Sequence, residues 1–229
     1  MIATSVRRTW SAELGTRARR HFLLTLIGTT AFTFVFFVGY LYIQRHPAYP
    51  LTVMPLTVLD RLIPFQPHAL FAYLSLWVYV GVGPGLQRTR TDILVYTAWM
   101  GALCLVGLGI FYFLPTQVPP PILDVSKSVG FAMLRQLDAA GNACPSMHVA
   151  VALFTAVRID DVLRCARSPT PLRLANAACF AAIAYSTLAV KQHVVLDVVA
   201  GALMGAVFVL LSLRWRPDHG YDASYEGQR

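Results

Sequence analysis

The sequence predicts an all-α membrane protein, a polytopic helix bundle of about six transmembrane helices with both termini in the cytoplasm. Hydrophobic residues make up 56% of the chain and charged residues only 13%, whereas a soluble domain carries about 25% charged residues. The apolar residues fall in blocks of roughly 20, the length that crosses a bilayer. Lys and Arg gather in short segments between alternate blocks, as is typical of cytoplasmic loops.

Six apolar blocks predict the spans. They cover residues 22–43, 69–86, 93–114, 145–159, 174–190 and 193–213. The first block is too long for a signal-peptide core and no small-residue cleavage site follows it, so we expect it to be retained. The fourth block is short for a span. Pro84 and the glycines around it are expected to unwind the last turn of the second span.

The segments outside these blocks complete the predicted organisation. Residues 1–21 are basic and form either an amphipathic helix on the anionic inner leaflet or a solvated tail. Residues 44–69 are rich in proline and are expected to lie on the outer surface, with a helical turn at 56–62. We therefore expect a membrane domain over 22–214, between two cytoplasmic tails, 1–21 and 215–229.

The basic residues set the orientation. With six spans, 14 of the 19 Lys and Arg residues lie on the side that holds both termini. The positive-inside rule then places the termini in the cytoplasm, and we expect the protein in the cell (inner) membrane. The net charge of +8 is spread over separate loops, so no nucleic-acid partner is expected. The four cysteines show no metal-ligand spacing and predict no disulfide framework.

Three ionisable residues lie at the outer ends of predicted spans, namely His148, His193 and Asp197. A charged side chain at the membrane centre costs about 2.5–3.5 kcal/mol and is taken as functional by default. If His193 opens the last helix, Asp197 lies one turn later on the same face. Its carboxylate then accepts a hydrogen bond from one imidazole nitrogen and leaves the other as a nucleophile. A His–Asp pair that only satisfies itself within the bundle explains this spacing equally well.

A second polar group opens the fourth span, where the sequence is Cys144-Pro145-Ser146-Met147-His148. Proline suits the first turn of a helix, and a helix N-terminus suits an anion because its N–H groups are unpaired. The serine adds a hydroxyl donor, and the protonated histidine could donate to a phosphate oxygen or to a leaving group. Taken alone, a serine near an incidental histidine explains this segment better.

Together, Pro145-Ser146-x-His148 and Ser186-x6-His193-x3-Asp197 resemble two of the three signatures of the type-2 phosphatidic acid phosphatase superfamily. That superfamily includes lipid phosphate phosphatases, undecaprenyl pyrophosphate phosphatases and inositol phosphorylceramide synthases. The likeness is close over residues 145–201, and the number and order of the spans extend it more loosely to most of the chain. Its members usually have six spans and an extracytoplasmic site, in agreement with the topology above.

The resemblance implies a role for each of five residues. His193 would attack phosphorus and form a phosphohistidine, and Asp197 would orient it. His148 would protonate the departing oxygen and then deprotonate water or an acceptor hydroxyl. Ser146 and Ser186 would cradle the phosphate. The implied partners are a membrane lipid phosphate and, for a transferase, a lipid alcohol, and no metal or other cofactor is implied because histidine and N–H donors supply the charge stabilisation.

The sequence departs from the family pattern at three points. Met147 stands where the second signature usually has glycine, Thr187 stands where the third usually has arginine, and the first signature, a lysine six residues before Arg-Pro, is absent. A phosphate dianion still needs a cation. The candidates on the outer side are Lys191, which we favour because it lies close to His193, and Lys127 and Arg135, which also fit plain solvated loop charges.

We therefore predict an integral membrane phosphatase that hydrolyses a lipid phosphate or pyrophosphate at the extracytoplasmic face. The departures, with the sequence Lys191-Gln192-His193, favour the inositol phosphorylceramide synthase-like branch, so a lipid head-group phosphotransferase is the alternative. A transporter or a catalytically silent scaffold is a third hypothesis, but broken helices near the midplane are not evident. Aromatic residues of the first spans, among them Tyr73 and Trp77, are expected to pack or to face lipid.

Overall fold

The computed structural model describes residues 9–119 and 142–215, and these residues are mostly helical. The elements are α1 (Trp10–Arg20), α2 (Phe22–Arg45), β1 (Thr52–Val53), α3 (Val58–Leu62), α4 (Ala69–Gly85), α5 (Arg90–Phe113), β2 (Thr116–Gln117), α7 (Met147–Cys165), α8 (Thr170–Ala189) and α9 (Val195–Arg214). The two strands pair in parallel. The predicted all-α class is confirmed, and the helical turn predicted at 56–62 is present as α3.

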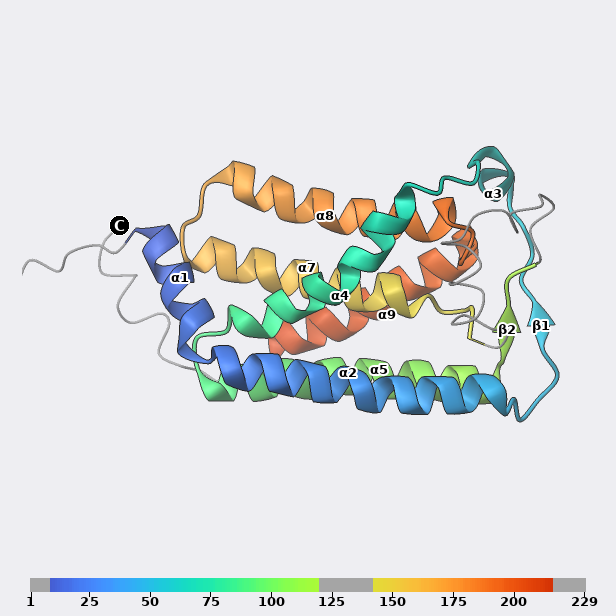
Figure 1. The fold of residues 1–229 in the computed structure, drawn as a ribbon, viewed down its shortest axis with the longest axis horizontal. Helices are drawn as coiled ribbons and strands as arrows, with labels where there is room; N and C mark the ends of the chain where they lie inside the picture. The colour runs from blue at the N-terminus through green and yellow to red at the C-terminus, as the bar shows by residue number, and fades with distance from the viewer. Residues whose placement is uncertain (1–8, 120–141, 216–229) are drawn as a thin grey trace, which may run out of the picture.

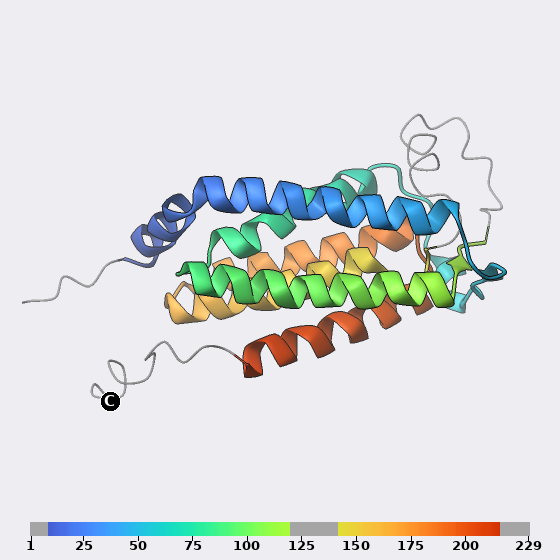
Figure 2. The ribbon, with the colours of Figure 1, turned by 90° about the horizontal axis from the view of Figure 1, so that it is seen from below.

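The six long helices run in alternating directions along the long axis of the molecule (Figures 1 and 2). Helices α2, α5 and α8 run from the end where α1 lies to the end where α3 and the strands lie, and α4, α7 and α9 run back. We call these the α1 end and the α3 end. The described chain therefore starts and finishes at the α1 end, as an even number of crossings requires.

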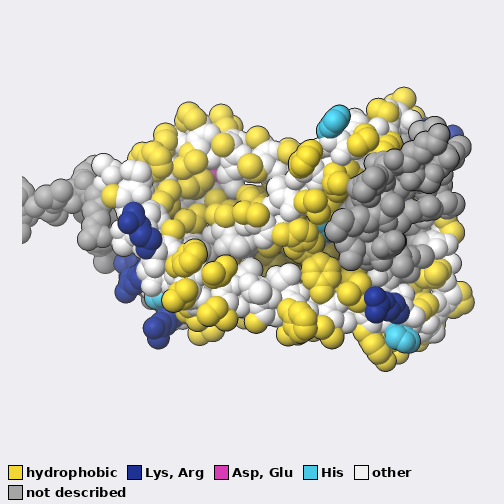
Figure 3. All heavy atoms as spheres, in the orientation of Figure 1, with side chains coloured by type: hydrophobic (Ala, Val, Ile, Leu, Met, Phe, Trp, Pro, Cys, Tyr) yellow, Lys and Arg dark blue, Asp and Glu magenta, His cyan; other side chains and the backbone are white. Residues whose placement is uncertain are grey.

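The outer faces of the helices are apolar. Within the described residues, four helices, α2, α5, α8 and α9, are long and apolar enough to cross a membrane, and α4 is apolar but shorter. On the face shown in Figure 3, hydrophobic side chains cover the middle of the molecule, whereas Lys and Arg side chains lie toward its two ends. This distribution suits an apolar surround with water at both ends. Spans at α4 and α7 stay predictions.

Helix α7 forms the centre of the bundle, in contact with α4, α5, α8 and α9. Its side chains Val149, Ala152 and Phe154 have no exposed surface. Small residues at other buried positions of α7, Ala150 and Ala156 among them, let neighbouring helices come close without a hydrophobic driving force between them. The core is therefore built around the helix that also carries His148.

The predicted break near Pro84 is wrong. Helix α4 continues through Pro84 to Gly85, and the backbone N–H of Leu86 still donates to Val82 O at 3.1 Å. The side chain of Gln87 donates to Gly83 O at 2.9 Å. A proline removes only one backbone donor, and the neighbouring bonds at this helix end are made, so the turn stays wound.

Candidate active site

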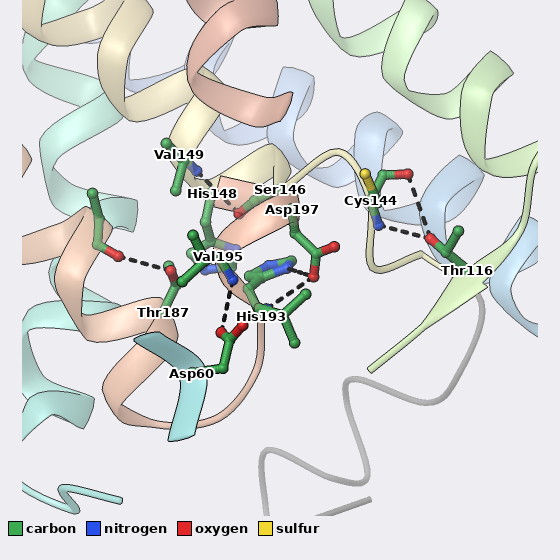
Figure 4. Close-up of polar contacts among 12 residues, drawn as sticks. Asp60, Thr116, Cys144, Ser146, His148, Val149, Thr187, His193, Val195 and Asp197 are labelled. Atoms are coloured by element: carbon green, nitrogen blue, oxygen red, sulfur yellow. Dashed lines mark hydrogen bonds and ion pairs between the residues drawn. The ribbon is translucent and has the colours of Figure 1, made fainter. Parts of the chain in front are cut away.

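The first turn of α7 places Ser146 and His148. Ser146 is the N-cap, and its hydroxyl oxygen accepts from Val149 N at 3.4 Å. The helix therefore begins at Met147, and the prediction that Pro145 lies in its first turn is wrong because the serine side chain caps the helix one residue later. His148 lies in the first turn of α7, which starts at the α3 end of the molecule (Figure 1), and Figure 4 shows it beside His193.

Close contact between α7 and α9 brings the two halves of the site together. A Cβ atom on Gly201 would lie 2.3 Å from Ser146 O, and one on Gly205 would lie 2.6 Å from Ala150 O. Only glycine allows backbones to approach in this way. The backbone N–H of Ser146 donates to Asp197 O at 2.9 Å, so the first turn of α7 is bonded directly to the first turn of α9.

His193 and Asp197 form the predicted pair, although His193 does not lie on the helix. Helix α9 begins at Val195, so the expectation that His193 opens it is wrong. The pair forms because the Asp197 carboxylate accepts from Val194 N at 3.0 Å, which turns it back toward the loop. Nδ1 of His193 lies 3.5 Å from Oδ2 of Asp197. Thr187 O accepts from His193 N at 3.1 Å and fixes the loop on α8.

The two imidazoles lie beside each other with polar atoms left over. The ring centroids of His148 and His193 are 6.2 Å apart. The 3.5 Å contact of His193 with Asp197 is an ion-pair distance without hydrogen-bond geometry. Among the described residues, Nε2 of His148, Nδ1 of His193 and Oδ1 of Asp197 are buried without a hydrogen-bond partner. Buried polar atoms are usually paired, so three unpaired atoms in one place indicate a site that a ligand completes.

Two aromatic side chains of α4 hold His148, which the sequence did not predict. The Tyr73 ring stacks on the imidazole with centroids 4.1 Å apart, and its hydroxyl lies 3.5 Å from Nδ1. The Trp77 ring meets the same imidazole edge-on at 5.5 Å. These contacts fix the plane of the ring and turn Nδ1 toward the tyrosine, which leaves Nε2 as the atom available for proton transfer. The four-residue spacing of the aromatics, which puts them on one helix face, was the available signal.

The predicted phosphate ligands differ in how many of their hydrogen-bond donors are already used within the protein. The Ser186 hydroxyl is fully buried and donates to Ile183 O at 2.6 Å. The Lys191 ammonium donates to Asp60 O at 3.0 Å and to Ile63 O, which uses two of its three donors. Burial lowers the pKa of Lys191, and the charge of Asp60 partly opposes this shift. The other two cation candidates, Lys127 and Arg135, lie outside the described residues.

Asp60 is a further residue that sequence reasoning missed. Its carboxylate oxygen Oδ1 accepts from Val195 N, the first residue of α9, at 2.8 Å. The available signal was local, because Thr57-x-x-Asp60 matches the capping-box pattern of a helix start. The contact with α9 was not available from the sequence, since 135 positions separate the two residues.

A thiol lies next to the site as well. Burial, with a smaller contribution from the charge of Asp197, raises the pKa of Cys144 to about 11, so the side chain stays a neutral thiol near pH 7. Cys144 N donates to the Thr116 hydroxyl at 2.8 Å and ties this loop to β2. No group of three or more His, Cys, Asp or Glu side chains within residues 9–119 and 142–215 is placed to hold a metal ion.

Helices able to cross a membrane, with two histidines and an aspartate gathered at one end of the bundle, are typical of a membrane protein with a candidate acid–base site. The chain belongs to the PAP2 superfamily, whose family model matches residues 65–211. The match covers α4 to α9 and includes His148, His193 and Asp197, and it confirms the superfamily predicted from the sequence. Searches of the curated proteins and of the solved structures gave no match. Membership supports a function of the phosphatase family.

Proposed function

We propose that the protein is an integral membrane phosphatase that hydrolyses a lipid phosphate or pyrophosphate through a phosphohistidine on His193. One observation supports this most directly. The unpaired Nε2 of His148 and the pair of His193 with Asp197 meet at the α3 end. A nucleophile, its orienting carboxylate and a separate acid are the three groups that two-step phosphoryl transfer requires.

In the first step, Nε2 of His193 attacks phosphorus, because Nδ1 faces Asp197. The N–P bond forms while the bond from phosphorus to the lipid oxygen breaks. His148 gives its proton to the departing oxygen through Nε2, and Asp197 stabilises the positive charge that develops on the attacking ring. A neutral lipid alcohol leaves, or a lipid monophosphate when the substrate is a pyrophosphate.

In the second step, neutral His148 removes a proton from water, and the resulting hydroxide attacks the phosphohistidine. The N–P bond breaks, inorganic phosphate leaves and His193 returns to its neutral form. Because the first step needs neutral His193 and protonated His148, the pH–rate profile should be bell-shaped.

The phosphate would be held at the first turn of α7. The N-terminal end of a helix carries a partial positive charge and N–H groups that suit an anion, and Ser146 adds its hydroxyl there. Ser186 would join by turning its hydroxyl from Ile183 O toward the anion. The third N–H of Lys191 is one candidate for the balancing cation, beside Lys127 and Arg135.

The site would face the extracytoplasmic side of the cell membrane. The described termini lie at the α1 end (Figures 1 and 2), and most Lys and Arg residues fall on that side in the predicted topology. The α3 end then lies at the outer surface, where a lipid head group can enter from the outer leaflet.

A lipid head-group phosphotransferase, similar to the inositol phosphorylceramide synthases, is the second candidate. It uses the same first step, but a lipid hydroxyl replaces water in the second. The departure at Met147 favours it, and that side chain is accommodated because Gly107 of α5 leaves room: a Cβ there would lie 2.3 Å from the methionine sulfur. The product decides between the two candidates.

The test is turnover of a panel of lipid phosphates and pyrophosphates by purified protein, with and without lipid alcohols. Free phosphate supports the phosphatase, and a new phospholipid supports the transferase. His193→Ala should lower kcat by about 10⁴-fold or more, whereas His68→Ala, an exposed histidine, should leave kcat unchanged. Alkaline quenching followed by mass spectrometry should find phosphate on His193. Turnover that survives His193→Ala would overturn the mechanism.

A further inference from the structure

Helix α9 has no capping side chain at its N-cap position, although Asp197 in its first turn accepts from the backbone N–H of Val194. Its N-cap residue is Val194, which has no oxygen to accept from the first unpaired N–H groups of the helix. The carboxylate of Asp60 supplies that acceptor from α3, with Oδ1 2.8 Å from Val195 N. Figure 4 shows this contact directly beside His193 and Asp197. An aspartate from a distant segment therefore caps the helix that carries Asp197.

Asp60 is itself held in place. Its second oxygen accepts from both the backbone N–H and the hydroxyl of Thr57, each at 2.7 Å, and the residue is only 8% exposed. The carboxylate thus joins the first turn of α3 to the first turn of α9. Because both of its oxygens are engaged, it cannot turn away without breaking a helix cap.

Lys191 makes a second connection between the same segments. Its backbone is in the left-handed region with φ 59°, which is uncommon for a residue other than glycine. Its ammonium donates to the carbonyl oxygens of Asp60 in α3 and of Ile63, the residue that follows α3. Residues 191–195 are therefore fixed to α3 at both ends, with His193 between them. We call these contacts, Asp60 to Val195 and Lys191 to Asp60 and Ile63, the α3 clamp.

We propose that Asp60 is a positioning residue which, through the α3 clamp, holds His193 against Asp197 for attack on phosphorus. The inference rests on the proposed function. Asp60 lies outside the residues that match the family model, 65–211, so family membership does not assign it this role. Misplacement of a reacting group by 1 Å can lower a rate by about 100-fold, and loss of the Asp60 carboxylate releases Val195, two residues after the nucleophile, from α3.

The test compares Asp60 with a matched aspartate. Asp92 forms the same Thr-x-x-Asp capping box at the start of α5, with its carboxylate accepting from Thr89 N at 3.0 Å and from the Thr89 hydroxyl at 2.8 Å. Asp60→Ala should lower kcat on the order of 100-fold with KM changed less than about threefold. Asp60→Asn should recover part of the loss, because its amide oxygen can accept from Val195 N. Asp92→Ala should leave kcat unchanged.

A double-mutant cycle separates an effect of Asp60 on the position of His193 from a general effect on the stability of the protein. If Asp60 acts through the His193–Asp197 pair, Asp60→Ala should lower kcat by only severalfold in an Asp197→Asn background, because the pair no longer functions there. Equal losses in both backgrounds, or a wild-type kcat in Asp60→Ala, would overturn the proposal.

Hydrogen exchange tests the clamp without any substrate. Amides of residues 191–198 should exchange faster in Asp60→Ala than in the wild type and should be unchanged in Asp92→Ala. Unchanged exchange in Asp60→Ala would show that the clamp does not hold the loop. A wild-type protein that turns over none of the lipid phosphates would instead count against the proposed function, and the two failures are therefore distinguishable.

Discussion

The two ends of the helix bundle both bury polar side chains, but they satisfy them differently. Toward the α1 end, the Tyr96 hydroxyl lies 3.0 Å from the Thr155 hydroxyl. Arg158 donates to Gln87 at 3.2 Å. At the α3 end, His148, His193 and Asp197 each keep a buried atom without a hydrogen-bond partner among the described residues, and the three side chains lie against one another. Toward the α1 end, by contrast, the buried hydroxyls without a partner, those of Ser168 and Ser212, belong to separate segments, the α7–α8 loop and α9.

This difference separates packing from chemistry. A buried polar group without a partner costs about 1–3 kcal/mol, so side chains that bond to one another hold helices together at little cost. Atoms left unpaired at one place reduce stability, and they are tolerated where a substrate pairs with them. The aspartates of the two Thr-x-x-Asp capping boxes show a similar difference. Asp92 and Asp60 each cap their own helix, and Asp60 in addition caps α9 beside the site.

The largest effect is expected from Asp197→Asn at the α3 end. The amide keeps the size of the side chain and an oxygen for Val194 N, so the helix cap survives. It loses the charge that stabilises the attacking imidazole and fixes its tautomer, and kcat should fall by about 10³–10⁴-fold. Steady-state kinetics with thermal unfolding in the same detergent measures both consequences. A kcat within tenfold of the wild type would contradict the role of the pair.

Gly201→Ala should have the next largest effect, because it separates the two helices that assemble the site. The new Cβ would lie 2.3 Å from the backbone oxygen of Ser146, and backbone cannot yield as a flexible side chain can. We expect a loss of about 1–3 kcal/mol in the free energy of unfolding together with a loss of activity. Gly109→Ala is the matched control, since a Cβ there meets nothing within 4 Å. Equal destabilisation by both substitutions would contradict the close contact of α7 and α9.

The sequence predicted those features that depend on local composition. Hydrophobicity adds up along a segment, so the starts of α2 and α4, at Phe22 and Ala69, were predicted to the residue. Motif spacing also brought His148, His193 and Asp197 into one hypothesis, since each lies in or just before the first turn of a helix and helix starts of alternate spans meet at one end. The superfamily followed from these same residues.

What the sequence could not predict depends on contacts between distant segments. Tyr73 and Trp77 read as ordinary apolar residues of a span, and only the crossing of α4 over α7 (Figure 1) places them on His148. Asp60 reaches Val195 only in the folded chain. The starts of α7 and α9 were misplaced by two residues for a related reason, because side-chain hydrogen bonds decide where a helix begins.

The smallest effects should come from one substitution made at both ends, tyrosine to phenylalanine. Tyr96→Phe removes the hydroxyl that bonds to Thr155, and the free energy of unfolding should fall by about 0.5–1.5 kcal/mol with kcat unchanged. Tyr73→Phe removes a hydroxyl that lies 3.5 Å from Nδ1 of His148 but keeps the stacked ring. Because that contact is long, stability should hardly change, whereas kcat should fall severalfold as the imidazole loses its orientation. Kinetics and thermal unfolding of the two variants, measured side by side, test this division of roles. A Tyr96 variant that loses activity, or a Tyr73 variant that loses only stability, would show that the two ends do not divide packing and chemistry between them.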